Sequence, residues 1–441
     1  MSKRCGLRLT LAMALVAAMV LPAATAAGDT AARATMGGDR LISGAKGKAD
    51  EWLPAVAYNA TSKLFLVVRE DERNTKWLGS DVFGRLVNSD GRPQGPDFRI
   101  SSTVDKVDEQ QPDVAWNQTD NQFLVVWTDY RDEFKWGSDI FGRLLEGDGT
   151  PLGPDFRISS GGSSETYPAV AWNKRKNEYL VVWQDSRNSG FHGADIYGHR
   201  LKADGTRVGL ADTLISKHEP GVDQGSWEQQ PDVAWSPASW SYLVVWADIE
   251  DGSGRGWDIY GRVMQGDGTF SGQEFRICGK AATSDEQWPA VAANAKQSRF
   301  LVVWMDWRQA ALRGADVYAQ QVKAAGGRID KETRLSAASA TADEGLPAVA
   351  WNATDNRYLV VWDDGRNSGA GRGTDTFGQY LDRVGAKIGG NFRISGPAAV
   401  KDEGAPAIAW GKTNAGFLVV RGDARDYASR GYDIYGRVVG G

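Results

Sequence analysis

Hydrophobic and polar residues follow the same order seven times along this chain. Each copy opens with Glu-x-x-Pro, continues with Val-Ala or Ile-Ala and a polar turn, and then enters Leu-Val-Val. A glycine-containing loop leads on to Asp-Ile-Tyr-Gly-Arg or a near relative. The prolines that mark the copies are Pro54, Pro112, Pro168, Pro231, Pro289, Pro347 and Pro406. Repetition at intervals of 56 to 63 residues predicts an array or ring of supersecondary units.

Each copy contains four runs with the character of β-strands. In the second copy these runs are 112–116, 123–127, 139–145 and 156–159. They are rich in Val, Ile, Phe, Trp and Tyr, which suit a packed, pleated surface. Asp148-Gly149, between the last two runs, is a strong hairpin signal. Seven units of four antiparallel strands predict an all-β fold, a seven-bladed β-propeller.

The two ends of the chain predict how the ring closes. The seventh copy stops soon after its third run, and its fourth run is absent. A matching run, Arg40-Leu41-Ile42-Ser43, lies near the amino terminus instead and resembles Phe98-Arg99-Ile100-Ser101. The strand at 40–43 is therefore expected to complete the last blade, which would otherwise present an unpaired edge. The propeller is expected to span 39–441, with blades starting near 51, 109, 165, 228, 286, 344 and 403.

The first 27 residues have the features of a secretory signal. Lys3, Arg4 and Arg8 precede an apolar stretch at 9–21, and Ala24-Thr25-Ala26 is a small-residue cleavage site. Residues 28–38 are read as a short linker. No long apolar run follows, so we expect a secreted, extracellular protein without a membrane span.

Composition narrows the possible partners. A net charge of −5, or about −8 without Lys3, Arg4 and Arg8, argues against a nucleic-acid partner held by phosphate contacts. Three histidines make a His-rich zinc centre a poor expectation. Beyond the signal, Cys278 is the one cysteine, so no intrachain disulfide is expected. We expect no cofactor and a monomeric protein.

The repeat itself carries a resemblance. Its Leu-Val-Val-Trp-x-Asp-x-Arg followed by Asp-Ile-Tyr-Gly-Arg is similar to the repeats of large secreted bacterial proteins. It lacks the dipeptides of WD40 repeats and the Ser-x-Asp-x-Gly-x-Thr-Trp box of sialidase-type blades. The resemblance covers 39–441 and implies a propeller fold without implying a reaction.

Three carboxylate positions recur in all copies: a Glu before the first strand, an Asp after the second and an Asp that opens the third. An Arg follows the second-strand Asp in six copies. In copies two and three the aspartates and arginines are Asp129, Arg131, Asp139, Asp185, Arg187 and Asp195. The favoured interpretation is structural, with each arginine bridging carboxylates of its loops. The alternative is a seven-fold Ca²⁺ or glycan site around the channel.

Two further sets of charges break the seven-fold repeat. Asp113 and Asp232 replace an Ala of the first strand in copies two and four, and are expected near the channel mouth with Glu109 and Glu228. Paired carboxylates are required for glycoside hydrolysis, but a hydrogen bond to the neighbouring blade is the favoured interpretation. Arg69 and Arg421 replace the Trp that ends the second strand elsewhere. They are interpreted as bordering the closure seam, or alternatively as a basic pocket for an anionic group.

Aromatic residues gather in loops of the face where the first strand begins. Candidate ligand contacts there are Trp136, His192, Trp227, Trp257 and Trp307. Loops on a rigid scaffold often carry binding sites, and exposed aromatic rings can stack on sugars. The leading hypothesis is a secreted protein that binds a glycan, or an extracellular protein partner, through these loops. The alternatives are a secreted glycoside hydrolase or polysaccharide lyase, and a scaffold subunit of an extracellular assembly.

Overall fold

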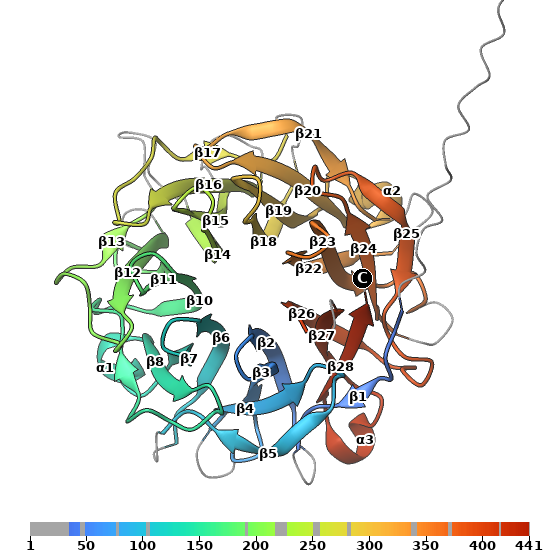
Figure 1. Cartoon of the computed structure of the whole chain (residues 1–441), viewed down its shortest axis with the longest axis horizontal. Coiled ribbons are helices and arrows are strands. Elements are labelled where there is room, and N and C mark those ends of the chain that lie inside the picture. The colour runs from blue at the N-terminus through green and yellow to red at the C-terminus, as the bar shows by residue number, and fades with distance from the viewer. Residues whose placement is uncertain are drawn as a thin grey trace, which may run out of the picture. The chain divides into compact units, whose positions relative to one another are not determined.

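A computed structural model describes residues 35–44, 49–75, 79–102, 106–189, 193–216, 227–249, 256–279, 284–336, 342–368, 373–413 and 416–440. These residues form seven sheets of four antiparallel strands, arranged around a common centre (Figure 1). The predicted seven-bladed β-propeller is therefore confirmed. In the described part of the chain, no helix has the length and apolar character needed to cross a membrane.

Each blade begins with an inner strand and then a second strand. The inner strands are β2 (Glu51–Asn59), β6 (Glu109–Asn117), β10 (Glu165–Asn173), β14 (Trp227–Ser236), β18 (Glu286–Asn294), β22 (Glu344–Asn352) and β26 (Glu403–Gly411). The second strands are β3 (Leu64–Asp71), β7 (Gln122–Asp129), β11 (Glu178–Asp185), β15 (Ser241–Ile249), β19 (Arg299–Asp306), β23 (Arg357–Asp364) and β27 (Gly416–Asp423). Neighbouring inner strands contact one another all the way round, which closes the ring.

A third and a fourth strand complete each blade toward its outer edge. The third strands are β4 (Asp81–Asn88), β8 (Asp139–Glu146), β12 (Asp195–Lys202), β16 (Asp258–Gln265), β20 (Asp316–Lys323), β24 (Asp375–Leu381) and β28 (Asp433–Gly440). The fourth strands are β5 (Pro93–Arg99), β9 (Phe156–Arg157), β13 (Thr213–Leu214), β17 (Phe275–Arg276), β21 (Arg328–Arg334), β25 (Lys387–Arg393) and, from the amino terminus, β1 (Arg40–Leu41). Short helical turns α1 (Glu133–Trp136), α2 (Ala310–Arg313) and α3 (Tyr427–Arg430) lie between second and third strands.

The seventh blade is built from both ends of the chain. Strand β1 pairs antiparallel with β28, with Arg40 opposite Gly436 and Leu41 opposite Tyr435. The next residue, Ile42, donates its N–H to the carbonyl of Ile434 at 2.7 Å, and its side chain is fully buried. Ile42 packs in a core cluster that joins blade seven to blade one. The predicted closure by residues 40–43 is confirmed.

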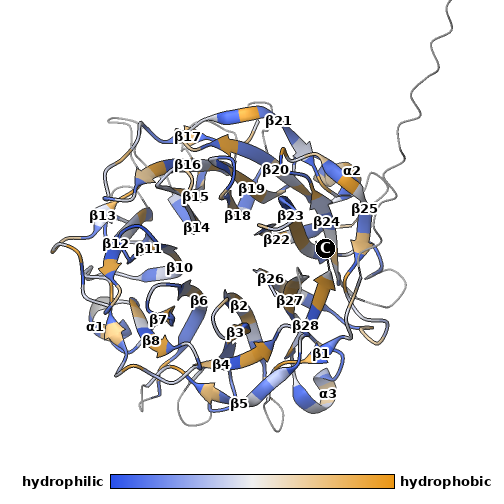
Figure 2. Ribbon diagram, viewed as in Figure 1, coloured by the Kyte–Doolittle hydropathy of each residue, from blue (hydrophilic) through white to orange (hydrophobic). Residues whose placement is uncertain are grey.

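The hydrophobic core lies between blades. Each core cluster mixes the second and third strands of two neighbours; Leu66 and Val82 of one blade, for example, pack with Val125 and Trp127 of the next. Hydrophobic residues accordingly recur in every blade (Figure 2). Because each blade buries one face on each neighbour, removal of any blade would expose apolar surface on two others.

Candidate functional site

The inner strands share an unusual backbone feature immediately before their prolines. The residue at this position has a positive φ, between 41° and 56°, in every blade. These residues are Leu53, Gln111, Tyr167, Gln230, Trp288, Leu346 and Ala405. The register with the second strand shifts at the same place, which marks a β-bulge. Left-handed backbone is costly for residues other than glycine and persists where surrounding contacts hold it.

Contacts from the preceding blade hold several of these residues in place. The N–H of Gln111 donates to Oε1 of Glu70 at 2.5 Å, and the N–H of Ala405 donates to Oδ2 of Asp363 at 2.9 Å. In the same way, Oε1 of Gln111 accepts the N–H of Tyr167 at 2.9 Å, and Oε1 of Gln230 accepts the N–H of Trp288 at 3.0 Å. Each bond crosses a blade boundary, so the bulges are fixed by the ring itself.

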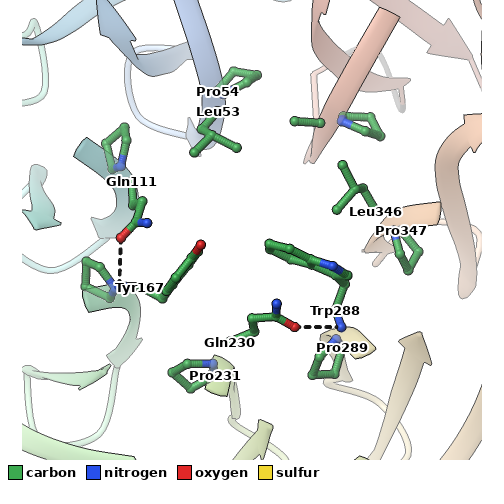
Figure 3. A pocket seen from close by; sticks show the side chains of 14 residues that line it. Leu53, Pro54, Gln111, Tyr167, Gln230, Pro231, Trp288, Pro289, Leu346 and Pro347 are labelled. Carbon is green, nitrogen blue, oxygen red and sulfur yellow. Dashed lines mark hydrogen bonds between the residues drawn. The ribbon is translucent and has the colours of Figure 1, made fainter. Parts of the chain in front are cut away.

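The bulges direct their side chains toward the centre of the ring (Figure 3). Together with the seven prolines they line an open cavity of about 330 Å³, called here the axial cavity. No charged side chain is among its fourteen lining residues. A volume near the lower end of the usual range for ligand pockets, about 300 to 1,000 Å³, suits a small ring-shaped group.

Two aromatic rings and two amides give this cavity its chemistry. The rings of Tyr167 and Trp288 lie with centroids 6.0 Å apart, at 73° to each other. The side chains of Gln111 and Gln230 also face the cavity (Figure 3). Because each amide oxygen accepts a backbone N–H, the amide is oriented and its NH₂ group remains able to donate to a ligand.

The axial cavity is not among the sites that the sequence predicts. Its polar and aromatic members occupy the position before each proline, where the seven copies carry five different residue types while the proline repeats. That variability within a constant frame was the signal available in the sequence, and the left-handed backbone that turns the side chains inward was not visible there.

The two extra aspartates are engaged with neighbouring blades. Oδ2 of Asp113 accepts the N–H of Val170 at 2.7 Å, and Oδ2 of Asp232 accepts the N–H of Val291 at 2.7 Å. These contacts match the favoured interpretation, a hydrogen bond across the blade boundary. Burial raises the pKa of Asp113 to about 6 and that of Asp232 to about 7, and the charge of Asp113 adds to the second shift.

The repeated glutamates lie at blade junctions and are not among the residues that line the axial cavity. Glu109 is fully buried and Glu228 is nearly so. The expectation that these two sit at the channel mouth is therefore wrong, because each packs at the junction with the previous blade. Between blades three and four, Oγ of Ser216 donates to Oε2 of Glu228 at 2.9 Å. Burial raises the pKa of Glu344 to about 8.

The arginines after the second strand act as structural forks. In blade two, Nε of Arg131 donates to Oδ1 of Asp129 at 2.8 Å, and Nη2 contacts Asp155 before the fourth strand at 3.1 Å. The guanidinium also lies 3.8 Å from the ring centroid of Phe141.

Blade three repeats this arrangement. Nε of Arg187 donates to Asp185 at 2.9 Å and Nη2 donates to Asp212 at 3.0 Å. The aspartates that open the third strands are also held by side chains: Asp139 pairs with Arg157, and Asp195 accepts from Asn188 at 2.7 Å. These contacts agree with the structural interpretation of the charged positions.

Arg69 and Arg421 are fully buried inside carboxylate clusters. Nη2 of Arg69 contacts Asp97 at 2.7 Å and Asp71 at 3.0 Å. Nη2 of Arg421 contacts both oxygens of Asp39, at 2.8 and 2.9 Å. The alternative of a basic pocket for an anionic group is therefore wrong, since neither guanidinium reaches solvent. Both residues belong to the seam between blades seven and one.

The predicted aromatic platform is only partly described. His192 lies outside the described residues. The backbone of Trp136 is described, but the burial of its side chain is not. Trp227 is exposed, whereas Trp257 and Trp307 are half-buried, and Trp257 packs against a core cluster. None of these three lines the axial cavity.

One buried cluster has the composition of a metal site. The potential ligand atoms of Asp258, Cys278 and Glu286 lie within 4.8 Å of one another. Cys278 stands where other blades have the Ser at the end of the fourth strand, and its Sγ accepts from Nε of Arg276 at 3.2 Å. Burial raises the pKa of the thiol, and a guanidinium beside it disfavours a cation. We therefore regard the cluster as a variant of the structural junction.

The raised carboxyl pKa values predict a pH-dependent stability. A folded-state pKa above the unfolded value means that the stabilisation is complete below about pH 4 and is lost as the pH rises through about 7. The melting temperature should therefore fall between pH 5 and pH 8.5. Asp232→Asn retains an oxygen that can accept the N–H of Val291 and cannot titrate. Between pH 5 and pH 8.5, the melting temperature of this variant should fall less than that of the wild type, by a difference of at least about 3 °C in calorimetry. Equal falls in the two proteins would contradict the assignment.

Comparisons with known proteins identify the fold. No family model matches this chain, and no curated protein matches it. The GH93 α-L-arabinofuranosidase of Fusarium graminearum in complex with arabinobiose superposes with a TM-score of 0.51 at 10% identity, over 92% of this chain and 97% of that chain. A structure of the Fusarium graminearum α-L-arabinofuranosidase Arb93A with an iminosugar inhibitor gives a TM-score of 0.53 at 9% identity, over 92% and 98%. At these identities the likeness supports the propeller architecture alone.

Proposed function

We propose that this propeller binds a neutral oligosaccharide, with one sugar ring seated in the axial cavity. The observation that carries the proposal is the combination of two aromatic rings and two oriented amide donors in a cavity without charged groups. Aromatic faces pack against the C–H groups of a sugar, while amides bond its hydroxyls. An ionised ligand would lose hydration there without gaining a counter-charge. The proposal places the protein outside the cell, as its amino-terminal sequence predicts.

Trp288→Ala tests the proposal. Ala405 occupies the equivalent left-handed position in blade seven, so the fold tolerates alanine there. Loss of a central aromatic contact should weaken binding of the selected sugar by at least about 30-fold. A glycan array with the mature protein selects the sugar, with and without Ca²⁺, and calorimetry measures its dissociation constant.

Trp227→Ala is the matched control, because Trp227 is exposed and lies outside the cavity. It should leave the affinity unchanged. Loss of binding in the Trp227 variant with full binding in the Trp288 variant would move the site to the loops. A silent array would overturn the proposal.

Glycoside hydrolysis is the second candidate. The two arabinofuranosidase structures above are propellers, and arabinobiose is the sugar in one of them. Asp113 and Asp232 are a pair of acids with raised pKa values, as an acid catalyst requires. The same incubations, analysed for released sugar, distinguish the two functions. Turnover that is lost in Asp113→Asn and Asp232→Asn would establish hydrolysis, and unchanged sugar would favour binding alone.

A further inference from the structure

Blade seven carries a second concave site beside the start of its inner strand. Lys401, Asp402, Ala424, Arg425, Asp426, Tyr427, Ala428, Ser429 and Tyr432 line a groove of about 550 Å³, called here the outer groove. Tyr427 is 44% exposed, and its ring meets that of Tyr432 edge-on at 5.4 Å. Exposed rings beside hydroxyl, carboxylate and ammonium groups suit a polyhydroxylated ligand.

Two strands connect the outer groove to the axial cavity. In blade seven, Lys401 and Asp402 line the groove and Ala405 lines the cavity, with only two residues between them. In blade one, the ring of Trp52 lies against that of Tyr432 of the groove, with centroids 3.8 Å apart and planes tilted by 34°, and the next residue, Leu53, lines the cavity. The two sites therefore share a wall.

The side chains that separate the two sites are smallest in blade seven. The position two residues before the proline is Trp52, Gln110, Thr166, Gln229, Gln287, Gly345 or Gly404 in the seven copies. A Cβ added at Gly345 would meet Sδ of Met305 at 2.5 Å, so that space is filled. A Cβ at Gly404 would have one neighbour within 4 Å, Oδ2 of Asp363 at 3.5 Å. The cavity residue that follows is Ala405, the smallest of the seven.

From this arrangement we infer that the ligand is an extended oligosaccharide, which runs from the axial cavity over Gly404 into the outer groove. The inference rests on the proposed function and adds the path and length of the ligand. One sugar ring occupies the axial cavity, the next crosses the gap above Gly404, and later residues lie against Tyr427 and Tyr432. A ligand of two sugars would leave the groove unused.

The test compares a short and a long sugar in calorimetry. Arabinobiose and linear arabinohexaose are the first pair; if the array selects another neutral glycan, its disaccharide and hexasaccharide replace them. The hexasaccharide should bind the wild type at least about tenfold more tightly than the disaccharide. Gly404→Leu fills the gap at a position without positive φ and with room for a Cβ. It should abolish this advantage and leave the disaccharide affinity unchanged within about twofold.

Two further variants make the result specific. Gly390→Leu is the matched control, because Gly390 lies on the outer strand β25 with nothing within 4 Å of an added Cβ, and it should change neither affinity. Tyr427→Ala should weaken the hexasaccharide alone. Equal affinities of the two sugars for the wild type, or an undiminished advantage in Gly404→Leu, would overturn the path while disaccharide binding upheld the proposed function. Binding of neither sugar, with a silent array, would overturn both.

Discussion

Removal of residues 38–44 should lower the melting temperature of this protein by at least about 10 °C. The segment supplies the whole fourth strand of blade seven, and without it β28 presents an unpaired edge. The fully buried side chain of Ile42 leaves the core, a loss worth about 2 to 5 kcal/mol in comparable truncations. Asp39 lies within the deleted segment, so Arg421 also loses this carboxylate partner. Calorimetry of the truncated and intact proteins measures the change.

A milder variant keeps the test informative where the truncation does not fold. Ile42→Ala removes the same core contact, and Ile158→Ala removes the equivalent contact within blade two. Both isoleucines are fully buried, so both variants should be destabilised to a similar extent. A nearly neutral Ile42→Ala beside a costly Ile158→Ala would show that the amino-terminal strand is only loosely attached.

Asp39→Ala should cost about 3 to 5 kcal/mol of unfolding free energy, because it removes one of the carboxylates that neutralise a buried guanidinium. Arg421 is fully buried and contacts both oxygens of Asp39. The same carboxylate also pairs with Arg425 at 2.5 Å. Asp39 therefore partners both arginines. Without it, Glu403 and Asp423 remain as their carboxylate partners. Denaturant unfolding measures the difference.

Asp155→Ala is the matched control for this ion pair. Asp155 contacts Arg131 in blade two just as Asp39 contacts Arg425, but Trp127 stands there in place of a second arginine. Arg131 is partly exposed and keeps its fork to Asp129. The control should therefore cost about 1 kcal/mol or less. A cost for Asp39→Ala no greater than that of the control would show that the buried guanidinium does not depend on the amino-terminal carboxylate.

The architecture could be predicted because the sequence patterns that determine it are local and recur in each copy. Alternating apolar runs and Asp-Gly turns define four strands in a copy, and the displaced run at 40–43 identifies the closure. Strand ends were less certain: residues 156–159 were expected to form a strand, but β9 covers only Phe156–Arg157. Beyond this pair, the N–H groups of Ile158 and Ser159 both donate to the carbonyl of Ile140, at 2.7 and 3.3 Å, so the regular strand pairing ends there.

The candidate site could not be predicted in the same way. Side-chain direction in a strand normally alternates, but the bulge before each proline interrupts that alternation. Position 111 therefore faces the cavity, whereas Glu109, only two residues away, is buried at a junction. Likewise, charge alone could not show that Arg69 is enclosed, because enclosure depends on Asp97 from the fourth strand of the same blade, 28 residues further on.

The split blade also has a consequence for the timing of folding. Ser43 and its partner Asp433 are 390 residues apart, so the first strand to be synthesised finds its place only when the last strand has been made. Contacts this distant in sequence form slowly, since a long loop must close before they stabilise anything. Early blades can pair with one another, but the finished ring must await the carboxyl terminus. A chain whose synthesis is incomplete would thus remain an open arc of blades, and closure of the ring would be its final step.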